Sequence, residues 1–464
     1  MKVKLILPSL IEAKSPFWRP IKYSLFPPLG LATLASYLSE TDEIDLQDEH
    51  VEKINFETTP ELVIIQVYIT NANRAYSIAD FYRKKGSYVV LGGLHVTSLP
   101  EEAQEHADSI FIGPAEQTFP EFLRDFKMKT PKKRYISLEG RTIENQPPMR
   151  RDLLKRNKYL VPNSLVISRG CPHACDFCYK ESFYRGGKSF YTQRVDEILA
   201  EIERLKGKHL YFLDDHLFGN PKLARELFEG MKGMNRVFQG AVTIKSILED
   251  DLIEKAAEAG LRSIFVGFET FSEKNLIQSN KNHNVKIDYE KAVKKLHNLG
   301  IMINGSFVFG LDNDNKDVFK RTVDWGIKNS LTTSTYHILT PYPGTKLYEK
   351  LNNEGRIITK NWDLYDTRHA VYKPNLLTVD ELESGYEWAY KEFYKWSNIL
   401  DASFAHESLK HKIKHLIYTG GWKKFEGIWN IAINIGGLKG MLPILELLLS
   451  KVEYAKNVKE NSSV

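Results

Sequence analysis

Short apolar runs alternate with amphipathic segments through the first third of the chain. The apolar runs have the length of buried strands, and the segments between them repeat apolar side chains at helical spacing. The strand candidates are residues 3–8, 62–70, 88–97 and 109–116, and the helix candidates are residues 27–40 and 72–86. Strands that alternate with helices predict a parallel, doubly wound α/β sheet of the Rossmann type over residues 1–130. In such sheets ligands bind beyond the carboxyl ends of the strands.

The alternation is lost over residues 131–163 and resumes over residues 164–373. The first stretch is basic and contains proline, as expected of a linker that lies over a surface. The second stretch holds about six strand-then-helix units, whose helices repeatedly end in Gly or Asn. These units predict a partial (β/α)6 barrel of the TIM type, with active groups at the carboxyl ends of its strands.

Residues 374–464 are predicted to form a helical carboxyl-terminal domain. Within it, residues 419–459 carry Trp422, Phe425 and Trp429 interleaved with lysines. Two interpretations stay open, namely an amphipathic helix at a membrane interface and a docking helix that covers the barrel. No stretch of the sequence reaches the roughly 18 uninterrupted apolar residues of a spanning helix, so any membrane contact would be peripheral.

Composition and charge narrow the class of protein. The 464 residues are 42% apolar and 27% charged, which is typical of a soluble globular protein. The net charge of +5 is spread over the whole length, so we expect no nucleic-acid partner. The start, MKVKLILPSL, is read as a strand and not as a signal peptide, because the apolar run ends at Pro8. We therefore expect a cytoplasmic protein with reduced thiols.

The chain has only three cysteines, Cys171, Cys175 and Cys178, and they lie within eight consecutive positions. Iron–sulfur clusters are held by cysteine thiolates, and a cubane cluster has four irons. Three thiolates therefore leave one iron without a protein ligand, and catalytic metal sites keep such an open coordination position for a substrate. The alternative is a zinc knuckle with His173 as the fourth ligand. His173 lies between the first two cysteines, which is too close to complete a tetrahedron easily.

The stretch Cys-x-x-x-Cys-x-Phe-Cys, with Phe177 before the third cysteine and Tyr179 after it, resembles the signature of the radical S-adenosylmethionine (SAM) superfamily. The resemblance implies a 4Fe–4S cluster on the three cysteines and a SAM molecule bound to the open iron. It also implies cleavage of SAM to a 5′-deoxyadenosyl radical, with an electron from a flavodoxin or ferredoxin. Phe177 and Tyr179 are then expected beside SAM.

Three further segments resemble SAM-contacting parts of that superfamily. FLDDHLFG places Asp214 and Asp215 at the end of the second barrel strand, although the usual Gly-Gly-Glu is absent. VGFET places Glu269 where the family approaches the SAM ribose, and GSFVFGL places Gly310 beside the adenine. A structural alternative exists for the carboxylates, because an acidic pair after a strand is often a helix cap and a strand-end Glu is often solvated.

Residues 1–130 resemble the cobalamin-binding domain that precedes the barrel in one radical SAM branch, the class B methyltransferases. The Gly92-Gly93 pair would let the backbone approach a flat corrin, since glycine has no side chain. Thr70 and Glu116, at adjacent strand ends, are expected near the nucleotide tail or the corrin amides. His50 follows Asp48 as in a cobalt-ligating motif, but no Gly stands three residues later, so we interpret His50 as a surface residue.

The resemblance implies a cobalamin-dependent radical SAM enzyme that methylates an unactivated carbon of a small molecule. The amphipathic carboxyl end favours a hydrophobic or lipid-like substrate. Candidate substrate residues near predicted strand ends are Tyr191, Tyr336, His337 and Tyr342. The alternatives are radical cyclisation, coupling or rearrangement without methyl transfer, and a non-enzymatic metal- or corrin-binding regulator.

Overall fold

The computed structural model describes residues 1–10, 26–138, 140–404, 406 and 409–420. Its first sheet is entirely parallel and has the strand order β2-β1-β3-β4-β5-β6. The strands are β1 (Lys2–Leu7), β2 (Glu43–Asp48), β3 (Leu62–Gln66), β4 (Tyr88–Gly92), β5 (Ser109–Ile112) and β6 (Arg134–Ile136). Because β1 lies between β2 and β3 and the chain winds outward from it in both directions, the doubly wound sheet is confirmed.

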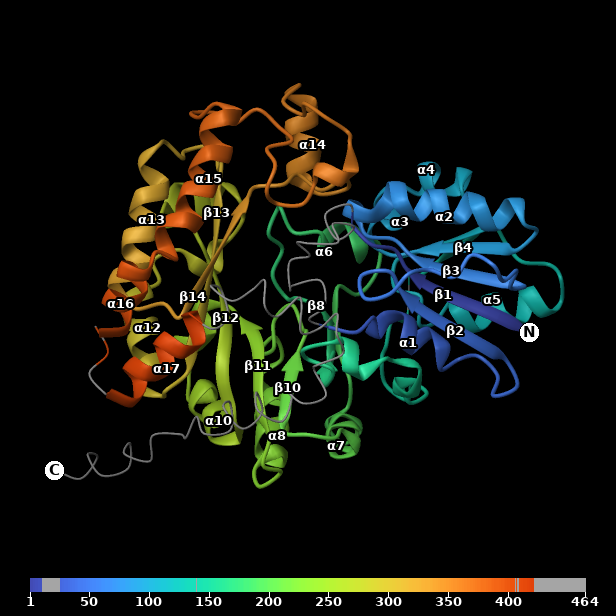
Figure 1. The fold of residues 1–464 in the computed structure, drawn as a ribbon, viewed down its shortest axis with the longest axis horizontal. Coiled ribbons are helices and arrows are strands. Elements are labelled where there is room, and N and C mark those ends of the chain that lie inside the picture. The colour runs from blue at the N-terminus through green and yellow to red at the C-terminus, as the bar shows by residue number, and fades with distance from the viewer. Residues whose placement is uncertain (11–25, 139, 405, 407–408, 421–464) are drawn as a thin grey trace.

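Helices cover both faces of this sheet (Figure 1). One face packs against α1 (Leu29–Ala35) and α5 (Phe119–Lys127), and the other against α2 (Ala72–Lys84), α3 (Leu94–Ser98) and α4 (Pro100–Glu105). Successive side chains of a strand point to opposite faces. In β3, Ile64 accordingly enters the α1–α5 core, whereas Val63 and Ile65 enter the α2–α4 core. Burial on both faces explains why these strands are continuous apolar runs.

The connection between the two sheets is more buried than a surface linker would be. The first sheet continues past residue 130 to β6, and the short helices η4 (Arg151–Leu153) and η5 (Arg156–Lys158) follow. Arg141, Ile143 and Tyr159 are buried in this connection. The expectation of a segment lying over the surface is therefore corrected, because apolar and hydrogen-bonded side chains of the connection fill the space between the domains.

The second sheet is also parallel, with the order β14-β13-β12-β11-β10-β7. Its strands are β7 (Ser164–Leu165), β10 (His209–Phe212), β11 (Val237–Val242), β12 (Leu261–Glu269), β13 (Met302–Phe309) and β14 (Thr333–Ile338). The two edge strands of this sheet, β7 and β14, are not paired with each other. The partial barrel is therefore confirmed as an open one.

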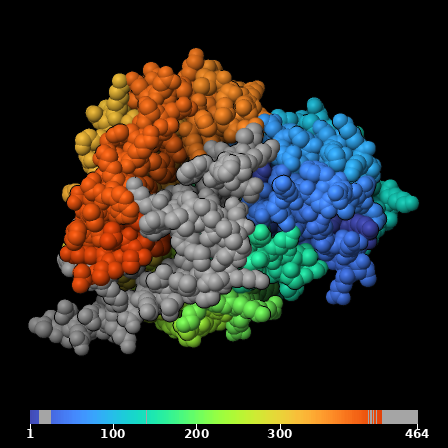
Figure 2. All heavy atoms as spheres, viewed as in Figure 1, coloured from blue at the N-terminus to red at the C-terminus, as the bar shows by residue number. Residues whose placement is uncertain are grey.

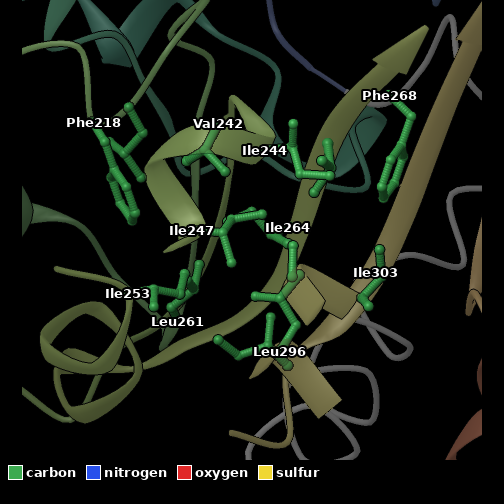
Figure 3. Packing of buried hydrophobic residues seen from close by; sticks show 14 of the residues in the cluster. Phe218, Val242, Ile244, Ile247, Ile253, Leu261, Ile264, Phe268, Leu296 and Ile303 are labelled. Atoms are coloured by element: carbon green, nitrogen blue, oxygen red, sulfur yellow. The ribbon is translucent and has the colours of Figure 1, made fainter. Parts of the chain in front are cut away.

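An outer layer of helices covers the barrel strands. These helices are α7 (Val195–Arg204), α8 (Pro221–Met231), α9 (Ile244–Leu248), α10 (Leu252–Ala259), α11 (Glu273–Gln278), α12 (Tyr289–Asn298), α13 (Asp317–Lys328) and α14 (Lys346–Asn353). Figure 3 shows how Ile247, Ile264 and Leu296 from two helices and one strand fill the space between the layers. This apolar layer fixes the strands whose carboxyl ends carry the candidate site.

A small antiparallel hairpin lies between the two sheets. It pairs β8 (Ser168–Gly170) with β9 (Phe190–Thr192), and the cysteine loop and α6 (Lys180–Phe183) lie between these strands. Gly170 has φ 74°, and a Cβ added there would lie 2.0 Å from the carbonyl oxygen of Ser189. Only glycine fits this close approach of two backbones, so Gly170 fixes the start of the cysteine loop.

The carboxyl-terminal helices are α15 (Val379–Phe393), α16 (Trp396–Phe404) and α17 (Leu409–Thr419). α15 covers β14, where the Tyr394 hydroxyl bridges the Ser334 backbone at 2.8 and 2.9 Å. Most of the amphipathic segment expected over residues 419–459 lies outside the described residues. In the part of the chain that the structure describes, no helix is both long and apolar enough to cross a bilayer.

We predict that Gly170→Ala disrupts the hairpin and the cysteine loop. The new Cβ meets backbone that cannot rotate away, so the cost should exceed the roughly 1–2 kcal/mol of a left-handed L-residue alone. Gly86→Ala is the matched control, because Gly86 has φ 87° and nothing within 4 Å of an added Cβ. Thermal unfolding should show a clearly larger loss for Gly170→Ala, and equal losses in the two variants would contradict this account.

Candidate active site

The cysteine loop is pinned from both sides by backbone hydrogen bonds. The Cys178 N–H donates to the Cys175 carbonyl at 3.0 Å, which closes a turn around Asp176. The Asp176 N–H donates to the Ser279 carbonyl at 3.1 Å, and the Asp176 carbonyl accepts from the Leu347 N–H at the same distance. The loop that carries the thiols is therefore held by segments from two other barrel units.

The chemistry of the three thiols fits the expected cluster. Burial raises the pKa of Cys175 to about 11 and that of Cys178 to about 12, and it raises the pKa of Cys171 as well. The positive charge of the Lys281 ammonium acts to lower the pKa of Cys171 and Cys175. Iron would hold the thiols as thiolates in this buried place, because a metal ligand must be deprotonated.

His173 does not join the cysteines. Its ring stacks on His283, with centroids 3.7 Å apart, and lies 5.7 Å from the ring of His216. Burial lowers the pKa of all three imidazoles, to about 3 for His216 and His283. Among the described residues, no three His, Cys, Asp or Glu side chains are arranged to hold a single metal ion. The zinc-knuckle alternative therefore receives no support from the geometry.

The two adjacent aspartates after β10 have different surroundings. The Asp214 carboxylate is buried and accepts the Ile167 and Ser168 N–H groups, so it holds the strand that leads to the cysteines. Burial raises the pKa of Asp214 to about 6, although these hydrogen bonds act to lower it. Asp215 instead accepts the Tyr179 hydroxyl at 2.7 Å. Of the pair, Asp215 is better placed to meet a ligand beside the cluster.

Glu269 ends β12 in a strained conformation beside the cysteines. Its φ of 62° is unusual for a residue other than glycine, and the pairing of β12 with β13 shifts at this position. The carboxylate accepts a hydrogen bond from the Lys281 ammonium, with Nζ 2.6 Å from Oε1. Burial disfavours the charge on Lys281, but Glu269 and the nearby thiols raise its pKa above the usual value. Strain of this kind is typical of functional sites.

Phe177 lies next to this ion pair, and Gly310 directly follows the neighbouring strand β13. The Lys281 ammonium is 6.0 Å from the centroid of the Phe177 ring. Gly310 has φ 93°, and a Cβ there would lie 2.4 Å from the Tyr372 hydroxyl, which donates to the Gly310 carbonyl. The fold itself therefore requires glycine at this position, whether or not adenine lies beside it.

A cavity of about 750 Å³ lies where the first sheet meets the hairpin and α7. Its lining includes Gly92, Gly93 and Glu116 from the first domain and Arg169 from β8, but not Thr70, which lies in the short helix η3 (Ile69–Asn71). A cavity of this size between domains is typical of a ligand site. Three of the four residues expected near cobalamin thus share one cavity.

The structure gives two of these residues additional roles. A Cβ on Gly93, whose φ is 122°, would lie 2.6 Å from the Val67 carbonyl oxygen, so the packing of the first sheet requires this glycine. The Glu116 carboxylate accepts a hydrogen bond from the Arg169 guanidinium across the domain boundary, with Nε 2.8 Å from Oε1. Both side chains of the pair are largely buried. The pair connects the cavity directly to the strand that precedes Cys171.

His50 is buried and not a surface residue, which corrects the expectation from the sequence. It follows β2, the edge strand of the first sheet, and its Nδ1 lies 2.8 Å from Asp48 Oδ1. Asp48 also accepts the Tyr159 hydroxyl at 3.0 Å. Tyr159 belongs to the connection between the domains, so the Asp48–His50 unit anchors that connection against the first sheet.

The four substrate candidates occupy different environments. Tyr336 packs between the barrel and α15, against Phe309 and Tyr390, so it faces away from the barrel interior. Tyr191 is buried against Tyr184. Both tyrosines are held by packing, and a substrate contact of either one stays a prediction that this packing does not favour.

The other two candidates stay open. Tyr342 is half-buried at the core of the first domain, and it interacts electrostatically with the Cys178 thiol. His337 is half-buried on β14, and its Nδ1 lies 3.1 Å from the Thr367 hydroxyl. Thr367 has the unusual φ of 67° for a β-branched residue.

Sequence reasoning missed Lys281, Arg169, His216 and His283. Lys281 stands in the polar stretch SNKNHN, where nothing marks one lysine as buried. Arg169 directly precedes Gly170 and resembles any basic residue near a strand end. His216 follows the aspartate pair, which is the one local signal that was available.

Comparisons with known proteins agree with both domains. Residues 165–326 match the family model of the radical SAM superfamily, and residues 23–123 match that of the B12 binding domain. The chain is 31% identical over 392 residues to bacteriochlorophyllide d C-12(1)-methyltransferase of Chlorobaculum tepidum, covering 80% of this chain and 84% of that protein. It is 24% identical over 358 residues to hopanoid C-2 methylase of Rhodopseudomonas palustris, covering 72% and 66%.

Two solved structures share the fold. The cobalamin-dependent SAM radical enzyme OxsB with aqua-cobalamin bound superposes with a TM-score of 0.64 at 15% identity, covering 97% of this chain and 80% of that one. The radical SAM methyltransferase TsrM of Kitasatospora setae, with cobalamin and a 4Fe–4S cluster bound, superposes with a TM-score of 0.60 at 16% identity, covering 76% and 75%. With both domains matched, and at 31% identity over most of a known methyltransferase, the chain belongs to the cobalamin-dependent methyltransferases of the radical SAM superfamily.

Proposed function

We propose that this enzyme methylates an unactivated carbon of a small hydrophobic molecule. The single observation that carries the proposal is the joining of the cysteine strand to the cobalamin-type cavity through the Arg169–Glu116 pair. The named relatives act on bacteriochlorophyllide d and on hopanoids, which are both largely apolar. A tetrapyrrole or a polycyclic lipid is accordingly the substrate class that we favour.

Cys171, Cys175 and Cys178 would hold the cluster, and the groups facing it would hold SAM. When bound, the cluster and SAM supply the radical that removes a hydrogen atom from the substrate, and methylcobalamin supplies the methyl group. We assign Glu269 to the SAM ribose and Asp215 to its methionine part. Lys281 positions Glu269, because their ion pair fixes the carboxylate in its strained conformation. We assign Phe177 and Tyr179 to the exclusion of water from the bound SAM.

The cavity beside Gly92, Gly93 and Glu116 would hold part of the cobalamin. Its lining is mixed, with apolar side chains from the first sheet and charged ones from α7. That composition suits a large cofactor with an apolar body and amide arms. Tyr342 lies between the Cys178 thiol and the core of the first domain, so we propose it as a substrate-contacting residue.

We further propose that the enzyme acts in the cytoplasm and receives its electron from a small carrier protein such as flavodoxin or ferredoxin. Pro172 and Ala174 of the cysteine loop are exposed, so the loop is accessible to such a carrier. The carrier is required because reductive cleavage of SAM consumes one electron, which neither SAM nor methylcobalamin provides.

Anaerobic reconstitution should give about four iron atoms per chain and 5′-deoxyadenosine from SAM with a reductant. Cys178→Ser should lose both, since a two-cysteine site cannot hold the cluster firmly. His173→Ala is the control and should keep the iron, because His173 stacks on His283 instead of facing the cysteines. Loss of bound metal in His173→Ala, with zinc in place of iron in the unaltered protein, would refute the assignment.

Glu269→Gln should weaken SAM binding by about 10- to 100-fold, because hydrogen bonds to a charged group contribute about 1.5–3 kcal/mol. Equilibrium binding of SAM to the reconstituted enzyme measures this effect, with iron content as a check on the cluster. Glu273→Gln makes the same chemical change on an exposed turn of α11 and should bind SAM normally. Normal SAM affinity in Glu269→Gln would remove Glu269 from the site.

Ala200→Trp should block the cavity from the α7 side without touching the first domain, because Ala200 lines it there. We expect bound cobalamin to fall from about one per chain to less than about a fifth, measured by corrin absorbance after gel filtration. Ala200→Ser is the size control. Full cobalamin binding by Ala200→Trp would place the cofactor elsewhere.

A further inference from the structure

The helices α16 and α17 present their apolar side chains to solvent. In α16 these are Trp396, Leu400 and Phe404, and in α17 they are Leu409, Ile413 and Ile417. Each set is spaced i, i+4, i+8, so it forms one continuous stripe along its helix. All six side chains are between 39% and 71% exposed. We call these six residues the apolar face.

The opposite side of α17 is polar and faces the protein. The Thr419 hydroxyl donates to the Thr332 carbonyl at 2.6 Å, and the Tyr418 hydroxyl bonds with the Ser263 side chain of β12. His415 is buried, with its Nδ1 3.1 Å from His406 Nε2. A surface helix of a globular protein normally points its apolar stripe inward and its polar side outward. In α17 this polarity is inverted.

The two helices pack against each other, and α17 contacts the last residue of the α16 stripe. The Ser403 hydroxyl donates to the Lys412 carbonyl at 2.6 Å, and the Lys412 ammonium lies 5.7 Å from the centroid of the Phe404 ring. In the space-filling view, the orange-red atoms of this part of the chain lie at the outer margin of the molecule (Figure 2). A contiguous exposed apolar patch of this kind marks an interaction site.

Charge distinguishes between the possible occupants of this surface. The sequence of α17, LKHKIKHLIYT, contains three lysines, two histidines and no acidic residue. Apolar side chains interleaved with lysines, together with an exposed tryptophan, are typical of helices that lie in the headgroup region of a bilayer. Basic residues attract the negative surface of such a bilayer.

We propose that the apolar face of α16 and α17 docks this enzyme onto an anionic lipid bilayer. Each stripe extends over eight residue steps of its helix, or about 12 Å, so the helices would lie along the surface and not cross it. The docking rests on the proposed function in one respect, because a hydrophobic substrate would be collected from the bilayer that the face contacts.

Cosedimentation with vesicles tests the proposal on the full chain. The unaltered protein should bind vesicles of equal parts phosphatidylglycerol and phosphatidylcholine more tightly than vesicles of phosphatidylcholine alone. The triple variant Leu409→Ser, Ile413→Ser, Ile417→Ser should bind the mixed vesicles at least about tenfold more weakly, since it removes the apolar area that would be buried.

A matched control separates docking from general hydrophobicity. Met128, Ile136 and Leu376 are 49–64% exposed and lie outside α16 and α17. Their simultaneous replacement by serine removes a similar exposed apolar area and should leave vesicle binding unchanged. If the first triple variant melts at a lower temperature, the pair Leu400→Ser and Phe404→Ser on α16 tests the same face independently.

Three results would overturn the proposal. They are no binding of the unaltered protein to mixed vesicles, equal binding by both triple variants, and a change from dimer to monomer in the α17 variant without any vesicle binding. The last result would make the apolar face a contact between two copies of the chain. Formation of 5′-deoxyadenosine should be normal in every variant, so failure of docking and failure of the proposed chemistry can be distinguished.

Discussion

The largely buried ion pair between Arg169 and Glu116 is the interaction that joins the cysteine strand to the first domain. Arg169 lies one residue before Gly170 and two before Cys171, and Glu116 lies beyond β5 in the lining of the cavity. Burial disfavours the charge on Arg169, but Glu116 raises its pKa above the usual value. Removing one partner of such a pair costs about 3–5 kcal/mol, because the other charge is left buried and unpaired. The pair therefore fixes the cysteine strand relative to the cavity.

Several residues of the sequence motifs position the backbone of the site. Asp214 holds β8 through backbone N–H groups, Gly310 accepts the Tyr372 hydroxyl, and Gly93 packs on the Val67 carbonyl. Asp214 stands directly before Asp215, which accepts the Tyr179 hydroxyl beside the cysteines. This short motif thus combines a residue near the candidate site with a neighbour that positions it. Support of this kind is what holds a reactive group in a productive geometry.

The fold was largely predictable, because it depends on the period of apolar residues. Buried parallel strands are continuous apolar runs, and both sheets contain them. The cysteine site was predictable because three thiols within eight residues have few other uses. Lys281 and Arg169 were not predictable, since a buried cation is defined by its distant partner and Glu269 and Glu116 are 12 and 53 residues away. The packing of Tyr336 and Tyr191 was not predictable for a related reason, because the face of a strand end depends on a register that the sequence does not show.

The two domains meet through both apolar and polar contacts, and Trp362 and Val371 pack into the core of the first domain. The carboxyl ends of β4 and β5 point toward the hairpin that carries the cysteines, and α6 contacts α3 through the Ser98 and Ser182 hydroxyls at 2.9 Å. Tyr342 lies at the same boundary. A substrate carbon must meet the radical first and the methyl donor second, so both must reach it without large displacement. A rigid boundary meets this requirement, because the apolar packing holds the domains together and the ion pair with the hydroxyl contacts fixes their orientation.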